Sequence, residues 1–479
     1  MDFGKVESVR LPSNGKCALV FGMSTSMAEG EQQGVSSRHP FIDRPNRTLV
    51  GLALPVLFSL VAEPLTGIAD TAFVARIPGP EPVAALGIGT VAFSSIFWAF
   101  SFLGIGTQTE VSHDVGRGNT CHAEKNVSLA CVLAIGVGIC LLLLLSPFLR
   151  DIAVVLGAQG RVADLAREYM FYRLIGAPAV LVSVAAFGAL RGVQDMRTPL
   201  YVAVAVNGIN IVLDRFLIFG GLGIPAFGVA GAAVASSLSQ WVGAIWTLIV
   251  VAKRIGLTLR MRGAGVRRLL SIGGDLFVRT GLLLVFLGLC TRVANRFGAE
   301  EGAAYQAIRQ FFVFAALFLD AFAITGQSLV GYFIGARAVA QARRVAEVVC
   351  LWSMGTGAVL AVLMLAGQGF VAWLLVPPSA VDEFGPGWVV LALSLPVGAL
   401  SFATDGIHWG TGDFRYLRNA MLVASAVGAA HILLIEHIHP AHAMVHIWVA
   451  SAVWTAFRGG FGIIRIWPGV WDAPLKARG

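Results

Sequence analysis

Long apolar runs, separated by short polar connections, make up most of the chain. A helix needs roughly 20 apolar residues to cross a bilayer, and twelve runs are about that long or longer. We therefore expect an all-α polytopic membrane protein with twelve transmembrane helices. The expected spans lie near 48–77, 83–112, 126–149, 162–191, 198–220, 226–253, 267–296, 302–333, 345–370, 386–411, 416–436 and 441–465.

Composition supports the membrane interpretation. The chain is 57% hydrophobic and only 13% charged, whereas soluble domains carry about 25% charged residues. The net charge of +8 could suggest a nucleic-acid partner. However, the Lys and Arg residues lie in short patches between apolar runs, which is the topology signal of membrane proteins. The bilayer is therefore the expected partner, and nucleic acid is not.

Basic residues also predict the orientation of the chain. With the N-terminus inside, the cytoplasmic loops hold most of the Lys and Arg residues, six of them between Lys253 and Arg268. Both termini are then cytoplasmic in a multi-pass protein of the cell (inner) membrane. The expected organisation is a disordered cytoplasmic tail (1–44), an N-lobe (45–255), a basic linker (256–268), a C-lobe (269–466) and a cytoplasmic tail (467–479).

The two halves of the chain repeat. Residues 178–197, "PAVLVSVAAFGALRGVQDMR", align with residues 396–415, "PVGALSFATDGIHWGTGDFR", at an offset of 218 with seven identities in twenty positions. Six spans is an even number, so both halves enter the membrane from the same side. We therefore expect two six-helix lobes related by a parallel pseudo-two-fold repeat, with the substrate held near the midplane.

The first run carries two acids, Glu63 and Asp70, on either side of Pro64. A carboxylate at the bilayer centre costs at least ~2.5–3.5 kcal/mol, so an intramembrane acid is a functional candidate by default. A spacing of seven residues places both acids on one helix face. Burial disfavours the charged form of a carboxyl group, so such acids can exchange a proton for a cation. The alternative is a hydrogen-bonded structural pair.

The fifth run carries Asn207, Asn210 and Asp214 as one polar stripe. These side chains offer oxygen ligands to a cation and donors to a carboxylate, or they join helices through structural hydrogen bonds. The second half adds three further candidates for ion or substrate binding, namely Asp320, Gln327 and Asp405. Arg279 and Arg309 are possible counter-charges.

Several stretches resemble the multidrug and toxic compound extrusion (MATE) transporters, in particular the DinF-like branch. They include "LALPVLFSLVAEPLTGIADTAFVARI", "RGVQDMRTPLYVAVAVNGINIVLD" and "LDAFAITGQSLVGYFIGARA", and the likeness extends over roughly residues 45 to 465. The resemblance implies a V-shaped pair of six-helix lobes and export driven by inward proton or sodium flow. It also implies roles for the first-span acid Asp70 and bending proline Pro55, the fifth-span pair Asn210 and Asp214, the fourth-span tyrosine Tyr169 and the sixth-span hydroxyl Ser236.

Two departures from the family pattern bear on the coupling ion. Span 4 carries Ser183 and Phe187 where family members often have asparagines, and Glu63 replaces a neutral amide that is common in some branches. We favour the proton over sodium, because sodium needs several oxygen ligands and a proton needs one carboxylate. Pro64 cannot donate to the carbonyl of Leu60, so it forms, with Pro55, a candidate conformational switch.

The expected function is therefore secondary antiport of drug-like organic compounds against H⁺ by alternating access, performed by a monomer. Sodium coupling and a lipid-linked precursor flippase of the same superfamily are the alternatives. We expect no enzyme activity and no cofactor, because no catalytic constellation and no Walker loop is evident. The His-rich segment 431–446 matches no closed metal site, and we expect no resident metal.

Overall fold

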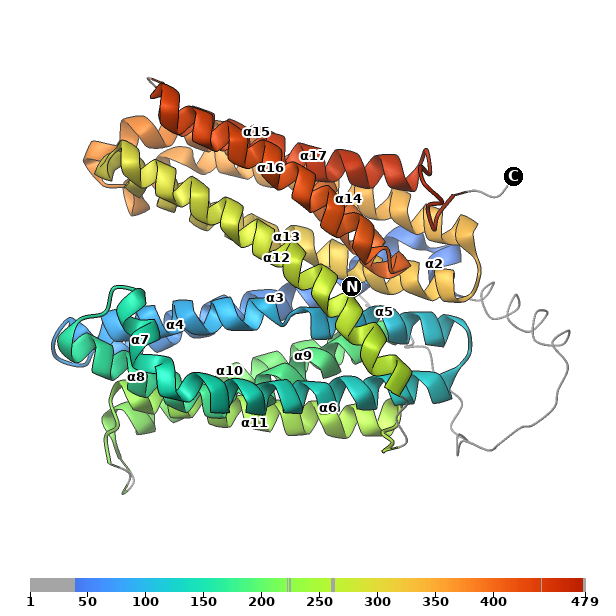
Figure 1. Ribbon diagram of the computed structural model, residues 1–479, viewed down its shortest axis with the longest axis horizontal. Coiled ribbons are helices and arrows are strands. Elements are labelled where there is room, and N and C mark those ends of the chain that lie inside the picture. The colour runs from blue at the N-terminus through green and yellow to red at the C-terminus, as the bar shows by residue number, and fades with distance from the viewer. Residues whose placement is uncertain (1–38, 222, 224, 260–262, 441, 477–479) are drawn as a thin grey trace, which may run out of the picture. The chain divides into compact units, whose positions relative to one another are not determined.

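The computed structural model describes residues 39–221, 223, 225–259, 263–440 and 442–476. Within these ranges the chain is almost entirely helical and contains no β-strand. Eleven helices are long and apolar enough to cross a membrane, or twelve if one bent pair is counted as a span. The all-α polytopic prediction is thus confirmed (Figure 1). Most of the expected N-terminal tail lies outside the described residues.

The helices of the first half follow the predicted runs. They are α2 (Pro40–Asp43), α3 (Pro45–Val74), α4 (Glu81–Ala99), α5 (Phe102–Gly116), α6 (Thr120–Leu145), α7 (Leu149–Val155), α8 (Gly160–Ile175), α9 (Ala177–Gly192), α10 (Arg197–Phe219) and α11 (Val229–Arg254). Those of the second half are α12 (Gly263–Phe297), α13 (Ala299–Gly335), α14 (Val339–Leu375), α15 (Val381–Thr411), α16 (Phe414–Ile438) and α17 (Ala443–Ile466). Short 3-10 helices precede α7 and α15.

The fourth predicted span, 162–191, corresponds to two helices, α8 and α9. The chain bends by 48° between α8 and α9 at Gly176. Pro178 has no N–H to donate to the carbonyl of Leu174, and a residue before proline disfavours the helical conformation. Gly176 also lies against Ser237 of α11, with room for no side chain of its own. The second predicted span, 83–112, lies within one candidate span, Glu81–Gly116, which has a short turn between α4 and α5.

The chain packs as two compact units, each described here by itself. One comprises Leu54–Gly273, and the other comprises Gly274–Gly479 together with the described part of Thr25–Ala53. The first described residues, 39–53, therefore belong to the second unit. There the ring of His39 lies 4.8 Å from that of Tyr332, and Trp352 donates a 3.0 Å hydrogen bond to Asn46.

Close helix contacts inside each unit repeat at equivalent positions. A Cβ atom added at Gly188 of α9 would lie 2.3 Å from the carbonyl oxygen of Gly104 in α5. One added at Gly406 of α15 would lie 2.2 Å from the carbonyl oxygen of Ala323 in α13. The two glycines differ in number by 218, and their partners by 219. The glycine identities of the sequence repeat thus mark the points where helix backbones touch.

Ion pairs repeat in the same way. Asp195, just before α10, pairs with Arg254 at the end of α11 over 2.8 Å. Asp413, just before α16, pairs with Arg465 at the end of α17 over 2.7 Å. In each unit, the loop before the fifth helix of the repeat is therefore joined to the end of the sixth. These matched contacts confirm that the halves are structural repeats.

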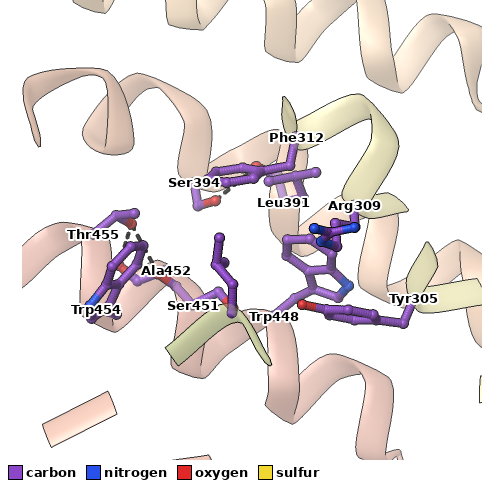
Figure 2. A pocket seen from close by; sticks show the side chains of 11 residues that line it. Tyr305, Arg309, Phe312, Leu391, Ser394, Trp448, Ser451, Ala452, Trp454 and Thr455 are labelled. Carbon is purple, nitrogen blue, oxygen red and sulfur yellow. Dashed lines mark hydrogen bonds between the residues drawn. The ribbon is translucent and has the colours of Figure 1, made fainter. Parts of the chain in front are cut away.

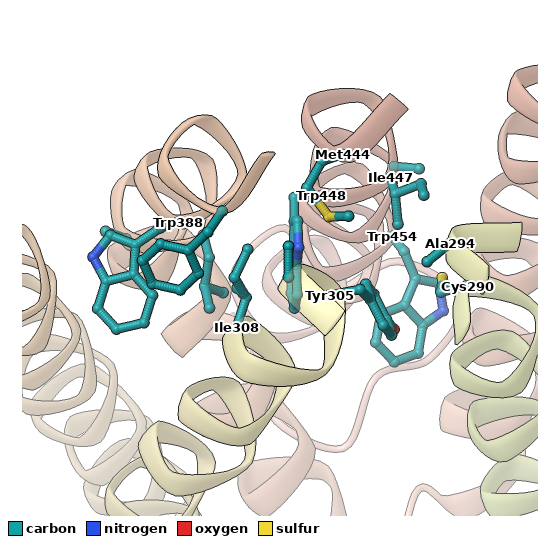
Figure 3. Close-up of a cluster of buried hydrophobic side chains, with 14 of the residues drawn as sticks. Cys290, Ala294, Tyr305, Ile308, Trp388, Met444, Ile447, Trp448 and Trp454 are labelled. Atoms are coloured by element: carbon teal, nitrogen blue, oxygen red, sulfur yellow. The ribbon is translucent and has the colours of Figure 1, made fainter. Parts of the chain in front are cut away.

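Aromatic side chains fill the core of the second unit (Figure 3). Tyr305 of α13 stacks on Trp448 of α17 with a centroid distance of 5.4 Å, and Trp454 stacks on Phe286 of α12 at 4.5 Å. Trp388 of α15 is fully buried and donates a 2.8 Å hydrogen bond to the carbonyl of Met364. This core fixes α12, α13, α15 and α17 around the polar residues described below.

Candidate functional site

Two acids on neighbouring helices of the first unit form the centre of the site. Asp70 on α3 is 8% exposed, and Asp214 on α10 is fully buried. Their carboxyl groups lie within hydrogen-bonding reach of each other. Two carboxylates at this distance repel each other when both are ionised, and a proton held by one allows a hydrogen bond to the other. The structure therefore brings together two residues separated by 144 positions in the sequence.

Asn210 and Ser236 complete the polar group around Asp70. With its side-chain amide oriented to satisfy both of its ends, Asn210 donates a 2.9 Å hydrogen bond to Asp70 Oδ1. Its oxygen then accepts a 3.3 Å hydrogen bond from the backbone N–H of Ser236 on α11. Asn210 is 1% exposed, so these bonds are shielded from solvent. The amide links the acid on α3 to α11.

Asp214 has different surroundings. Neither of its carboxylate oxygens receives a hydrogen bond from any residue that the structure describes. A buried carboxylate without a donor is costly, so Asp214 depends on a proton, on Asp70 or on an ion that enters the site. This arrangement suits a group that changes its protonation state during a transport cycle.

Arg173 of α8 is a charged neighbour that sequence reasoning missed. Its guanidinium interacts electrostatically with both Asp70 and Asp214, and it lies 4.2 Å from the ring centroid of Phe93. Arg173 follows Tyr169 by four residues, so the two share a helix face. That spacing from the tyrosine singled out by resemblance was the available signal.

Tyr169 itself is 2% exposed, and its ring packs closely against Gly89 of α4. It belongs to a buried apolar cluster of the first unit. Among the described residues, the hydrogen bonds around Asp70 do not include it. The structure thus places the tyrosine in the core of the unit that holds the acid pair.

The remaining polar candidates of α3 and α10 lie on the N-terminal side of Asp70 along α3. Asn207 donates a 2.7 Å hydrogen bond to the carbonyl of Ala62, which also accepts a 3.1 Å bond from Thr66 Oγ1. This contact ties α10 to α3 beside Pro64. Glu63, in contrast, is exposed and is not brought into the group around Asp70. Helix α3 runs unbroken through both Pro55 and Pro64.

In the second unit, Asp405 of α15 is held between two arginines. Arg279 of α12 and Arg458 of α17 both donate to its Oδ2 atom, Arg458 over 2.7 Å. All three side chains are less than 10% exposed. The sequence predicted Asp405 as a candidate coupling site and Arg279 as a counter-charge. It did not predict Arg458, because nothing in the stretch "TAFRGG" indicates which acid this arginine contacts. With two guanidinium partners, Asp405 is committed to ion pairs.

Asp320 and Gln327 of α13 have different surroundings. Asp320 is half-buried and interacts electrostatically with Asp405 and with both arginines. Gln327 is fully buried, and its backbone carbonyl lies against Gly410 of α15. Asp320 thus belongs with Asp405, Arg279 and Arg458 to one charged cluster of the second unit. Gln327, in contrast, lies at a close contact between α13 and α15.

A small pocket in the second unit is lined by aromatic rings, hydroxyl groups and one guanidinium (Figure 2). Arg309 of α13 contributes the guanidinium, and its Nε has no hydrogen-bond partner in the described part of the chain. Serine and threonine hydroxyls line the other side. The lining residues are Leu287, Tyr305, Arg309, Phe312, Leu391, Ser394, Trp448, Ser451, Ala452, Trp454 and Thr455.

Glu436 of the His-rich segment forms ion pairs with α12. Glu436 accepts a 2.6 Å hydrogen bond from Arg292 and a second bond from Arg296, both on α12. Within the described ranges, no group of three or more His, Cys, Asp or Glu side chains could hold a metal ion. The acid of this segment is thus used for ion pairs.

Comparisons with known proteins identify a single family. The family model MatE matches residues 55–216 and 279–433. Protein DETOXIFICATION 44, chloroplastic, of Arabidopsis thaliana is 30% identical over 91% of this chain and 86% of its own length. DNA damage-inducible protein F of Escherichia coli (strain K12) is 30% identical over 90% of this chain and 94% of its own length.

A solved MOP superfamily transporter from Pyrococcus furiosus has a TM-score of 0.81 at 21% identity, over 91% of this chain and 97% of that chain. A MATE structure in the bent conformation has a TM-score of 0.80 at 19% identity, over 92% and 97% of the two chains. At these identities the likeness shows the fold, and the fold is that of two-lobe transporters.

Proposed function

The chain belongs to the MATE family of membrane transporters, and we propose that it exports organic compounds in exchange for inward-moving protons. It is a multi-pass membrane transporter rather than an enzyme. The proposal adds alternating access, a cell (inner) membrane location with both termini in the cytoplasm, and a monomer that needs no cofactor. Relatives named "Probable multidrug resistance protein NorM", one of them from Thermotoga maritima, support organic compounds as the substrate class.

The observation that carries the proposal is the acid pair of Asp70 and Asp214. Both acids are buried, they lie within hydrogen-bonding reach, and Asp214 has no donor of its own in the described structure. A proton entering the pair removes the repulsion between the two carboxylates. When the pair releases this proton, a second negative charge returns to a buried site, where a charge is costly. Binding and release of a proton thus change the stability of the surrounding helices, as a switch requires.

Arg173 supports the proton over sodium as the coupling ion. A sodium site needs several oxygen ligands and no competing cation. Here a guanidinium already interacts with both acids, and the amide of Asn210 is engaged between Asp70 and Ser236. A proton needs neither extra ligands nor space beside the arginine.

The test uses the full-length protein in sealed vesicles loaded with a panel of organic cations and anions. We expect a pH gradient without sodium to drive transport. Asp70→Asn and Asp214→Asn should each abolish that transport while leaving the protein in the membrane. Asp151→Asn, at an exposed acid of α7, is the matched control and should transport normally. Transport that requires sodium and ignores the pH gradient would overturn proton coupling.

A further inference from the structure

The charged cluster of the second unit holds more donors than its acceptors use. Arg279 and Arg458 present five N–H groups each, yet both bond to one oxygen of a single carboxylate, Asp405. The Nε atoms of both arginines are buried and have no hydrogen-bond partner among the described residues. A buried donor without a partner costs about 1–3 kcal/mol, and more for a charged group. The cluster is therefore incomplete as it stands.

A second acid, Asp320, does not complete the cluster. Asp320 interacts electrostatically with both arginines, but within the described residues it makes no hydrogen bond to either. Among the groups joined by direct hydrogen bonds, the two guanidinium groups carry two positive charges and Asp405 carries one negative charge. Arginine in mid-membrane is expensive and by default marks a site where something binds.

Aromatic rings lie beside both guanidinium groups. Arg458 lies 4.5 Å from the ring centroid of Trp454, and Arg279 lies 5.4 Å from that of Trp409. Trp454 also lines the pocket of Figure 2. Guanidinium groups flanked by aromatic rings suit a ligand with a negative group on an apolar or aromatic body, because Arg forms paired hydrogen bonds with carboxylate and phosphate oxygens.

We propose that Arg279 and Arg458 bind the anionic group of an organic anion, such as a carboxylate or sulfonate, in the second unit. Asp405 holds the two guanidinium groups in place and offsets part of their charge. An acidic cavity favours organic cations, whereas this site would bind organic anions. Anion binding at these arginines can be tested by itself. The further step, that the bound anion is the exported substrate, rests on the proposed function.

The test measures equilibrium binding to the purified full-length protein with no gradient present. Benzoate and benzenesulfonate are the anionic probes, and benzyltrimethylammonium carries the opposite charge on a similar body. We expect the anions to bind and Arg279→Gln and Arg458→Gln to weaken their binding about tenfold or more, since hydrogen bonds to charged groups are of that strength. Arg292→Gln is the control, because Arg292 lies on the same helix and its partner Glu436 retains Arg296.

Asp405→Asn separates this proposal from a purely structural cluster. Removing the one directly bonded negative charge should tighten benzoate binding, whereas a structural role predicts lost stability and no gain in binding. If Arg279→Gln does not fold, Arg279→Lys keeps the charge but loses the planar donors and should still weaken binding. Unchanged benzoate affinity in folded variants at both arginines, or equal affinity for benzyltrimethylammonium, would overturn the proposal.

The two proposals fail independently. Proton-driven export with no anion binding would leave the proposed function intact and remove the anion site. Arginine-dependent anion binding without pH-driven transport would retain the site and remove proton coupling.

Discussion

Replacing Gly406 by alanine is expected to force α15 away from α13. A Cβ atom at this position would lie 2.2 Å from the carbonyl oxygen of Ala323 and 2.6 Å from its Cα, whereas ordinary contacts begin at 3.4 Å. The obstacle is helix backbone, which cannot turn aside as a side chain can, so the helices must separate by about 1 Å. Overpacking of this kind costs about 1–3 kcal/mol. Because the obstacle is backbone, we expect the upper end of this range, about 3 kcal/mol. The better helix propensity of alanine returns up to ~1 kcal/mol, which leaves a net loss of about 2 kcal/mol.

The assay is thermal unfolding of the detergent-solubilised protein. A loss of about 2 kcal/mol should lower the melting temperature by roughly 4–8 °C in a unit of this size. Gly188→Ala should behave alike, because its Cβ would lie 2.3 Å from the carbonyl oxygen of Gly104. Gly355→Ala is the control, since nothing lies within 4 Å of its Cβ position. If Gly406→Ala were as stable as Gly355→Ala, the reasoning from backbone contact would be refuted.

Three further predictions concern charges and hydrogen bonds. Arg173→Gln should let pH-driven export persist to higher pH, because the ionised acids lose a favourable cation; an unchanged profile across a pH series would contradict this role. Asn207→Ala should cost about 1 kcal/mol by removing the bond to Ala62, measured by thermal unfolding against Thr71→Ala, which loses only an exposed bond within α3. Arg465→Ala should destabilise the protein by about 3 kcal/mol, because that side chain is 9% exposed. Arg254→Ala, at the equivalent position of the first unit, should cost nearer ~1 kcal/mol, because Arg254 is 44% exposed. Equal losses would show that burial does not decide the strength of these pairs.

The spans and the repeat could be predicted from sequence because each depends on a local or periodic signal. A run of apolar residues is sufficient to predict a membrane helix, and matched Gly, Pro, Asp and Arg positions revealed the repeat. The bend at Gly176 was missed because a glycine followed by Ala177–Pro178 also occurs at the start of ordinary helices. Its effect depends on Ser237, a neighbour 61 residues away.

The candidate site was predictable only in part. Asp70, Asn210 and Asp214 were predicted because polar residues stand out in apolar runs. The spacing of Asn210 and Asp214 also placed these two on one face of the same helix. The contact between α3 and α10 has no local signal, so the direct pairing of Asp70 with Asp214 could not be derived from spacing. Arg458 likewise acquires meaning only when α17 packs against α15.

The order of synthesis has a consequence for how the second unit is assembled. Residues 39–53 leave the ribosome long before residues 274–479, yet they pack within the unit formed by Gly274–Gly479. Asn46 must wait for Trp352, 306 residues later, which is about 15–60 s at usual elongation rates. Cutting the chain between Arg254 and Gly263 would therefore not yield two self-sufficient halves. The C-terminal fragment would lack His39, which packs against Tyr332, and supplying residues 39–53 separately should be needed to complete it.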